Sequence, residues 1–126
     1  WAAMLMIGAG LMLLIAIALQ SAAQPPRQRM EDATYAWMAC GTRYADRWVD
    51  QNETASDLAA LATARCTDER RQAREAIEEY ARSERAMSAV DRMFDETERS
   101  VRQVIAVNVL EARTKDKARP KPVGKR

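Results

Sequence analysis

The chain opens with a long apolar segment that carries no charged side chain. Residues 1–26 are all uncharged, and residues 4–19 read MLMIGAGLMLLIAIAL. About 20 consecutive apolar residues in a helix, at roughly 1.5 Å per residue, cross the hydrocarbon core of a bilayer. This segment is apolar on every face, which is not the pattern of a helix on the surface of a soluble domain. We therefore expect residues 1–24 to form a transmembrane helix that anchors the chain.

A cleaved secretory signal is the alternative interpretation of this segment. Ser21-Ala22-Ala23 places small side chains directly before Gln24, so a signal peptidase would cut between Ala23 and Gln24. Pro25 and Pro26 follow, and a proline disfavours helical geometry at the residue before it. We assign residues 25–30 to a linker. With either interpretation, the remainder of the chain lies outside the cytoplasm.

Beyond the linker, apolar residues take up the spacing of amphipathic helices. No Gly or Pro occurs between Thr42 and Arg119, which favours helix over strand. In the first segment, residues 31–50, apolar side chains recur at steps of three or four and so share one helical face: Ala33, Trp37, Cys40, Tyr44 and Trp48. A polar turn at residues 50–53 ends this helix, and Thr54 can cap the next.

A second apolar stripe begins at Leu58 and continues at helical spacing to Leu110. Ser88 could cap a new helix after a break near residues 82–88, but no Gly or Pro marks that break. The pattern favours one long helix over residues 56–113, with a three-helix bundle as the alternative. The second half of a long helix would find no partner within the chain. We therefore predict that it binds a protein partner or a second copy through Val90, Phe94, Val101, Val104 and Leu110.

The two cysteines lie symmetrically about the predicted turn. Cys40 is ten residues before Asp50, and Cys66 is ten residues after Ser56. An antiparallel hairpin folded about Glu53 therefore brings the two sulfur atoms together. Alanine and glycine neighbours on both segments permit the close helix approach that a disulfide needs. We predict a Cys40–Cys66 disulfide formed in an oxidising compartment, with two buried free thiols as the alternative.

Composition argues against an enzyme. The chain has no histidine and only four glycines, so it lacks the commonest general base and metal ligand, and no glycine-rich phosphate loop can be written. Two cysteines without histidine argue strongly against a structural zinc site, which usually has four cysteine or histidine ligands. The carboxylates of Asp91, Asp95 and Glu98 share a helical face, but interleaved arginines indicate a solvated charged face rather than a cation site. We expect no catalytic residue, no metal and no cofactor.

The C-terminal residues are strongly basic. Residues 113–126 carry seven basic and one acidic side chain, net +6, whereas residues 27–112 have net −4. Two prolines and mutual repulsion favour an extended tail. Such a tail either contacts an anionic surface, formed by lipid head groups or by an acidic protein face, or is merely solubilising; nucleic acid is not expected for an exported domain. Its basic side chains are Lys115, Lys117, Arg119, Lys121, Lys125 and Arg126.

These patterns predict an exported all-α protein in four parts: a membrane anchor (1–24), a linker (25–30), a disulfide-clamped helical domain (31–112) and a basic extended tail (113–126). The expected function is that of a non-catalytic accessory or scaffolding subunit. It would be single-pass, with its body on the periplasmic or extracellular side, and would dock on a membrane protein complex or self-associate. If the N-terminal segment is cleaved, the product is instead a soluble helical binding protein of the periplasm or extracellular space.

Overall fold

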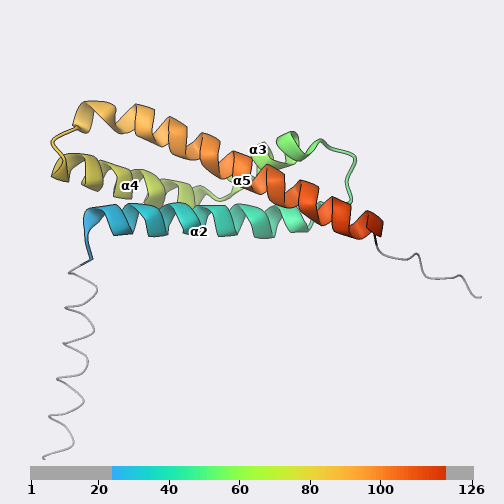
Figure 1. The fold of residues 1–126 in the computed structure, drawn as a ribbon. Coiled ribbons are helices and arrows are strands. Elements are labelled where there is room, and N and C mark those ends of the chain that lie inside the picture. The colour runs from blue at the N-terminus through green and yellow to red at the C-terminus, as the bar shows by residue number, and fades with distance from the viewer. Residues whose placement is uncertain (1–23, 119–126) are drawn as a thin grey trace, which may run out of the picture.

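The computed structural model describes residues 24–118, and this part of the chain is all-α, as predicted (Figure 1). Its four helices are α2 (Pro26–Asp46), α3 (Ala55–Arg65), α4 (Thr67–Ser83) and α5 (Val90–Ala118), and a 3-10 turn, Met87–Ala89, precedes α5. The membrane or signal helix predicted for residues 1–24 falls almost wholly outside the described residues. Among the helices within 24–118, none is long and apolar enough to cross a membrane.

The helices form a bundle of three rods (Figure 1). In chain order these are α2, then α3 and α4 together, which we call the middle rod, and then α5. The middle rod runs antiparallel to α2, because Arg29 pairs with Glu79 while Cys40 bonds to Cys66. It also runs antiparallel to α5, as the ion pairs Arg70–Glu98 and Arg74–Asp91 show. Consequently α2 and α5 point in the same direction and pack directly on each other.

The start of α2 corrects the predicted linker. The helix begins at Pro26, so most of residues 25–30 are helical. Proline is well tolerated at the first helical position, since its missing N–H would have no intrahelical acceptor there. Side-chain hydrogen bonds between residues one turn apart then stabilise the start of the helix. Arg27 donates to Glu31 at 3.1 Å and Gln28 to Asp32 at 3.0 Å.

The predicted long helix over residues 56–113 is wrong, and the first of its two breaks lies at Cys66. This residue has φ −86° and ψ 63°, outside the helical range, between α3 and α4. The Thr63 carbonyl, which in a continuous helix would accept from the amide of residue 67, instead accepts from the indole Nε1 of Trp37 at 3.2 Å. A contact with α2 thus replaces the helical bond at the break.

The second break follows α4 and lies within the range named as the alternative to a long helix. Arg85 adopts a left-handed φ of 53°. The amide of Ala86 bonds to the carbonyl of Ala81 at 2.8 Å, and the amide of Arg85 to that of Arg82 at 3.2 Å. This pair of bonds is the Schellman motif that ends many helices. The chain therefore turns back, and α5 packs on the other helices instead of extending away from them.

The core lies where the three rods meet. Trp37 of α2 is fully buried and stacks on Phe94 of α5, with ring centroids 5.8 Å apart and planes inclined by 15°. Aliphatic side chains from α3, α4 and α5 make up the rest of the core, and the largest fully buried ones are Leu58, Ile77, Val101, Ile105 and Val109. Trp48 was expected on the same buried stripe as Trp37, but α2 ends at Asp46 and Trp48 lies in the following turn with 43% of its surface exposed.

Candidate protein-binding face and the disulfide

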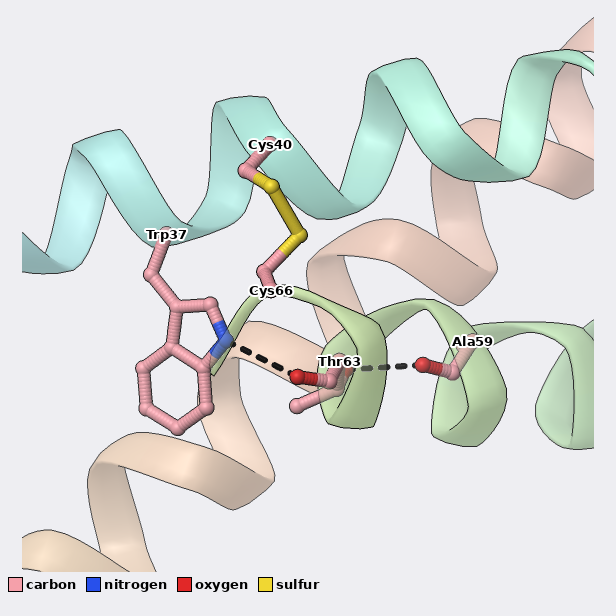
Figure 2. The surroundings of a disulfide bond; sticks show 5 residues. All are labelled: Trp37, Cys40, Ala59, Thr63 and Cys66. Carbon is pink, nitrogen blue, oxygen red and sulfur yellow. Dashed lines mark hydrogen bonds between the residues drawn. A yellow bond between two sulfur atoms is a disulfide. The ribbon is translucent and has the colours of Figure 1, made fainter. Parts of the chain in front are cut away.

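Figure 2 shows the disulfide that links α2 to the junction of α3 and α4. The sulfurs of Cys40 and Cys66 lie 2.07 Å apart and their Cα atoms 6.1 Å apart, so the pairing predicted from the sequence is confirmed. Closing a loop with a sequence separation of 26 residues stabilises a fold by about 3–4 kcal/mol on the chain-entropy account. Next to it, the Trp37 indole donates to Thr63, and the Thr63 hydroxyl donates to the Ala59 carbonyl at 2.7 Å.

Two arginine side chains of α4 lie over the ring of Phe94. The guanidinium carbons of Arg70 and Arg74 lie 4.8 and 5.1 Å from the centroid of the Phe94 ring, which is cation–π distance. Arg70 bonds to Glu98 at 3.0 Å and Arg74 to Asp91 at 2.7 Å. The hydrogen bond to Asp91 raises the pKa of the Arg74 guanidinium above its ordinary value. These contacts fix α4 against α5 at the ring of Phe94.

A groove follows these arginines. One hollow of about 350 Å³ lies between the α3–α4 junction and α5, and a second of about 390 Å³ adjoins it along α4, with Thr67 and Arg70 lining both. All four arginines that line the groove pair with carboxylates of this chain: Arg70 and Arg102 with Glu98, Arg71 with Glu75, Arg74 with Asp91 and Glu78. The charges of the groove are therefore compensated within the chain, and two of the ion pairs, Arg70–Glu98 and Arg74–Asp91, hold α4 against α5. Of the three carboxylates considered for a cation, Glu98 lines the groove and Asp91 pairs with one of its arginines, Arg74.

The predicted partner interface divides into buried and exposed residues. Val90, Phe94 and Val101 are 6%, 4% and 0% exposed, so these three belong to the core and cannot meet a partner. The correction follows from the second break, which folds their face of α5 onto α2 and α4. By contrast, Val104 and Leu110 are 38% and 54% exposed.

One residue of this exposed face was missed from the sequence. Val107 is 46% exposed, and it lies between Val104 and Leu110 on the side of α5 that faces away from the bundle. A hollow of about 380 Å³ on that side is lined by Ser100, Gln103, Val104, Val107 and Asn108. We define the outer face of α5 as Ser100, Gln103, Val104, Val107 and Leu110. Hydrophobic periodicity in the sequence identifies the buried stripe of α5. The outer face is instead indicated by the near absence of charged residues over 101–110.

The basic end of the chain begins inside α5. Residues 113–118 were expected to be extended, but α5 continues to Ala118, since no proline occurs before Pro120. Lys115 and Lys117 therefore lie in its last turn, where cations interact favourably with the helix dipole. Arg113 instead reaches back and donates to the carbonyls of Val49, Gln51 and Glu53 at 2.9, 3.0 and 2.8 Å. The other predicted tail residues, Arg119, Lys121, Lys125 and Arg126, lie outside the described part.

Comparison of this chain with protein-family models, with curated proteins and with solved structures found no match.

Proposed function

We propose that this chain is a non-catalytic, membrane-anchored accessory subunit whose helical domain binds a protein partner through the outer face of α5. The outer face itself carries the proposal. Three aliphatic side chains are exposed on it, and the single charged residue within 101–110, Arg102, is held by Glu98 at 2.9 Å. A surface strip of this length without free charge is typical of a contact surface, because apolar area in water gains free energy when a partner covers it.

Charge next to the outer face specifies the kind of partner. Beyond Glu111, the net charge is positive: Arg113, Lys115 and Lys117 outnumber Asp116 on α5, and four further basic residues follow in the sequence. A complementary partner presents an apolar strip with acidic side chains at one end, as an amphipathic helix of another membrane protein does. A second copy is disfavoured, because each copy would add another segment of net +6 to the assembly.

Two sequence features support the location and the absence of catalysis. The apolar residues 1–24 have the length of a membrane anchor, and disulfides persist in oxidising compartments outside the cytoplasm. The chain contains no histidine, and the arginines that line the groove along α4 are neutralised by carboxylates of the same chain. The domain therefore offers a surface for binding rather than a set of reactive groups.

A photo-crosslinking amino acid at position 107 tests this proposal in native membranes. We expect one crosslinked species that contains a second protein, that weakens as salt is raised, and that is lost when Leu110→Glu is added. The same label at Leu61, which is 42% exposed on α3, is the matched control and should give no such species. A product of twice the chain's mass, or the same product from both positions, would refute the assignment of a heterologous partner to the outer face.

A further inference from the structure

Three potential metal-binding side chains meet at the disulfide. The Sγ atoms of Cys40 and Cys66 and a carboxylate oxygen of Glu69 all lie within 4.8 Å of one another. They come from different parts of the fold: Cys40 from α2, Cys66 from the α3–α4 junction and Glu69 from the first turn of α4. Cys66 is 3% exposed and the other two are half-buried. The site is therefore set into the bundle and is held from two rods.

Glu69 lies in the first turn of α4, where an acidic side chain interacts favourably with the helix dipole, and it makes no specific bond to the described residues of the oxidised domain. Within residues 24–118 its carboxylate has no hydrogen-bond or ion-pair partner, although most acidic residues of α4 are paired with arginines. It lies three residues after Cys66, the residue that precedes α4, where a glutamate commonly reaches back to the backbone amide. That bond is not formed here, and the carboxylate lies beside the sulfurs instead. The Glu69 carboxylate is therefore available as a third ligand beside the two sulfurs.

We infer that the reduced form of this domain binds Zn²⁺ through Cys40, Cys66 and Glu69. Thiolate sulfur at about 2.3 Å and carboxylate oxygen at about 2.0–2.2 Å are ordinary zinc ligands, and sites with three protein ligands keep a water as the fourth. In tetrahedral geometry those bond lengths place two sulfurs about 3.8 Å apart. The disulfide and the zinc ion therefore exclude each other, and the disulfide must open first.

The chemistry of opening is that of ordinary disulfide reduction. A dithiol or a phosphine supplies two electrons, the S–S bond breaks, and each sulfur takes up a proton; the dithiol becomes a disulfide, or the phosphine with water becomes a phosphine oxide. Zinc then binds both sulfurs as thiolates and the two thiol protons pass to solvent. The Glu69 carboxylate supplies the third bond and brings the ligand charge to −3 against the +2 of the ion.

Such a site would make the same connection as the disulfide. Zinc held by Cys40 on one side and by Cys66 and Glu69 on the other ties α2 to the α3–α4 junction, the place where the middle rod is broken. The disulfide would therefore hold α2 to the α3–α4 junction in an oxidising environment, and the zinc ion would hold them together in a reducing one. This inference is independent of the outer face of α5 and of the identity of any partner.

Zinc titration of the full chain, reduced with a phosphine and monitored with a competing chromogenic chelator, tests the inference. We expect one zinc per chain in the reduced state and no binding in the oxidised state. Glu69→Gln should weaken binding by at least about tenfold, and Cys40→Ser should abolish it. Glu75→Gln is the matched control, because Glu75 is on the same helix, pairs only with Arg71 and is 60% exposed; it should bind like the wild type.

Circular dichroism during the same titration distinguishes zinc binding to the folded domain from zinc binding to the cysteines of an unfolded chain. Helix content that is retained on reduction, or that returns when zinc is added, supports the site. Zinc binding to an unfolded chain without recovery of helix would overturn the inference. So would equal affinity in wild type and Glu69→Gln, one zinc shared by two chains, or binding in the reduced state that is no tighter than in the oxidised state.

Discussion

At the scale of single residues, Gly41 allows α2 and α5 to pack closely. This residue lies within α2 and is buried, and a Cβ added there would overlap Cδ1 of Ile105 and come within 3.2 Å of its Cγ1. Glycine inside a helix is less favourable than alanine by about 0.5–1 kcal/mol. The chain accepts this loss because α2 and α5 can then approach closely, and Asn108 donates to Thr42 at 3.2 Å beside the same contact.

Gly41 and Ile105 should therefore be energetically coupled. Ile105→Val alone should destabilise the domain by about 0.5–1.5 kcal/mol, as is usual for a buried isoleucine. In a Gly41→Ala background the same change removes the methyl group that the new Cβ meets, so it should cost less or should stabilise. Urea unfolding of the wild type, both single variants and the double variant measures the coupling, which we expect to be at least about 0.5 kcal/mol. Additive effects would mean that the two helices move apart freely.

At the scale of elements, the turn after α4 contains an unfavourable residue. A Schellman motif normally places glycine in its left-handed position, since a side chain there costs about 1–2 kcal/mol. This chain has Arg85 in that position with φ 53°. The hydrogen bonds of Ala86 and Arg85 to the last turn of α4 hold the conformation.

Arg85→Gly should accordingly stabilise the domain by about 1 kcal/mol. Arg82→Gly makes the same exchange three residues earlier, within α4, where glycine should destabilise by about 1 kcal/mol. Thermal melts of both variants, compared with the wild type, should shift in opposite directions. A loss of stability in both would show that Arg85 contributes contacts worth more than its backbone conformation costs.

The elements also show what the sequence could predict. Composition and periodicity were sufficient for the helical class, for Trp37 in the core and for the Cys40–Cys66 pair, because these depend on spacing along a helix. The break at Cys66 depends on a bond from Trp37 to the Thr63 carbonyl, which no local pattern encodes. For the break at Arg85, the sequence offers a possible cap at Ser88 but no glycine for the left-handed position, so the pattern favours a continuous helix.

The candidate site was only partly predictable for a related reason. The five residues predicted as a partner interface share a hydrophobic stripe, but burial depends on whether α5 folds back. Once it does, the stripe becomes core and only its margin remains exposed. The outer face of α5 is defined by three exposed aliphatic residues and by missing charge, and hydrophobic periodicity does not detect such a pattern.

At the scale of the whole molecule, Phe94 and Leu110 distinguish core from surface. Phe94→Asp places a charge against Trp37 in the core and should unfold the domain. Leu110→Asp changes a residue that is 54% exposed and should alter stability by less than about 0.5 kcal/mol. Circular dichroism and light scattering on both purified variants check this. If the Phe94→Asp variant is folded, Phe94 is a surface residue in the wild type, and the extended second helix is favoured over the bundle.

Because the bundle has three rods, the described part of the chain begins at one end of the bundle and ends at the other. The three rods alternate in direction, so the start of α2 and the end of α5 lie at opposite ends of the bundle (Figure 1). Helix α5 has 29 residues, which at 1.5 Å per residue is about 44 Å. A structure attached at the start of α2 and a structure bound at the basic end of α5 are therefore held a fixed distance apart. The domain thus has the geometry of a spacer, and the distance it spans is set by the number of helical turns in α5.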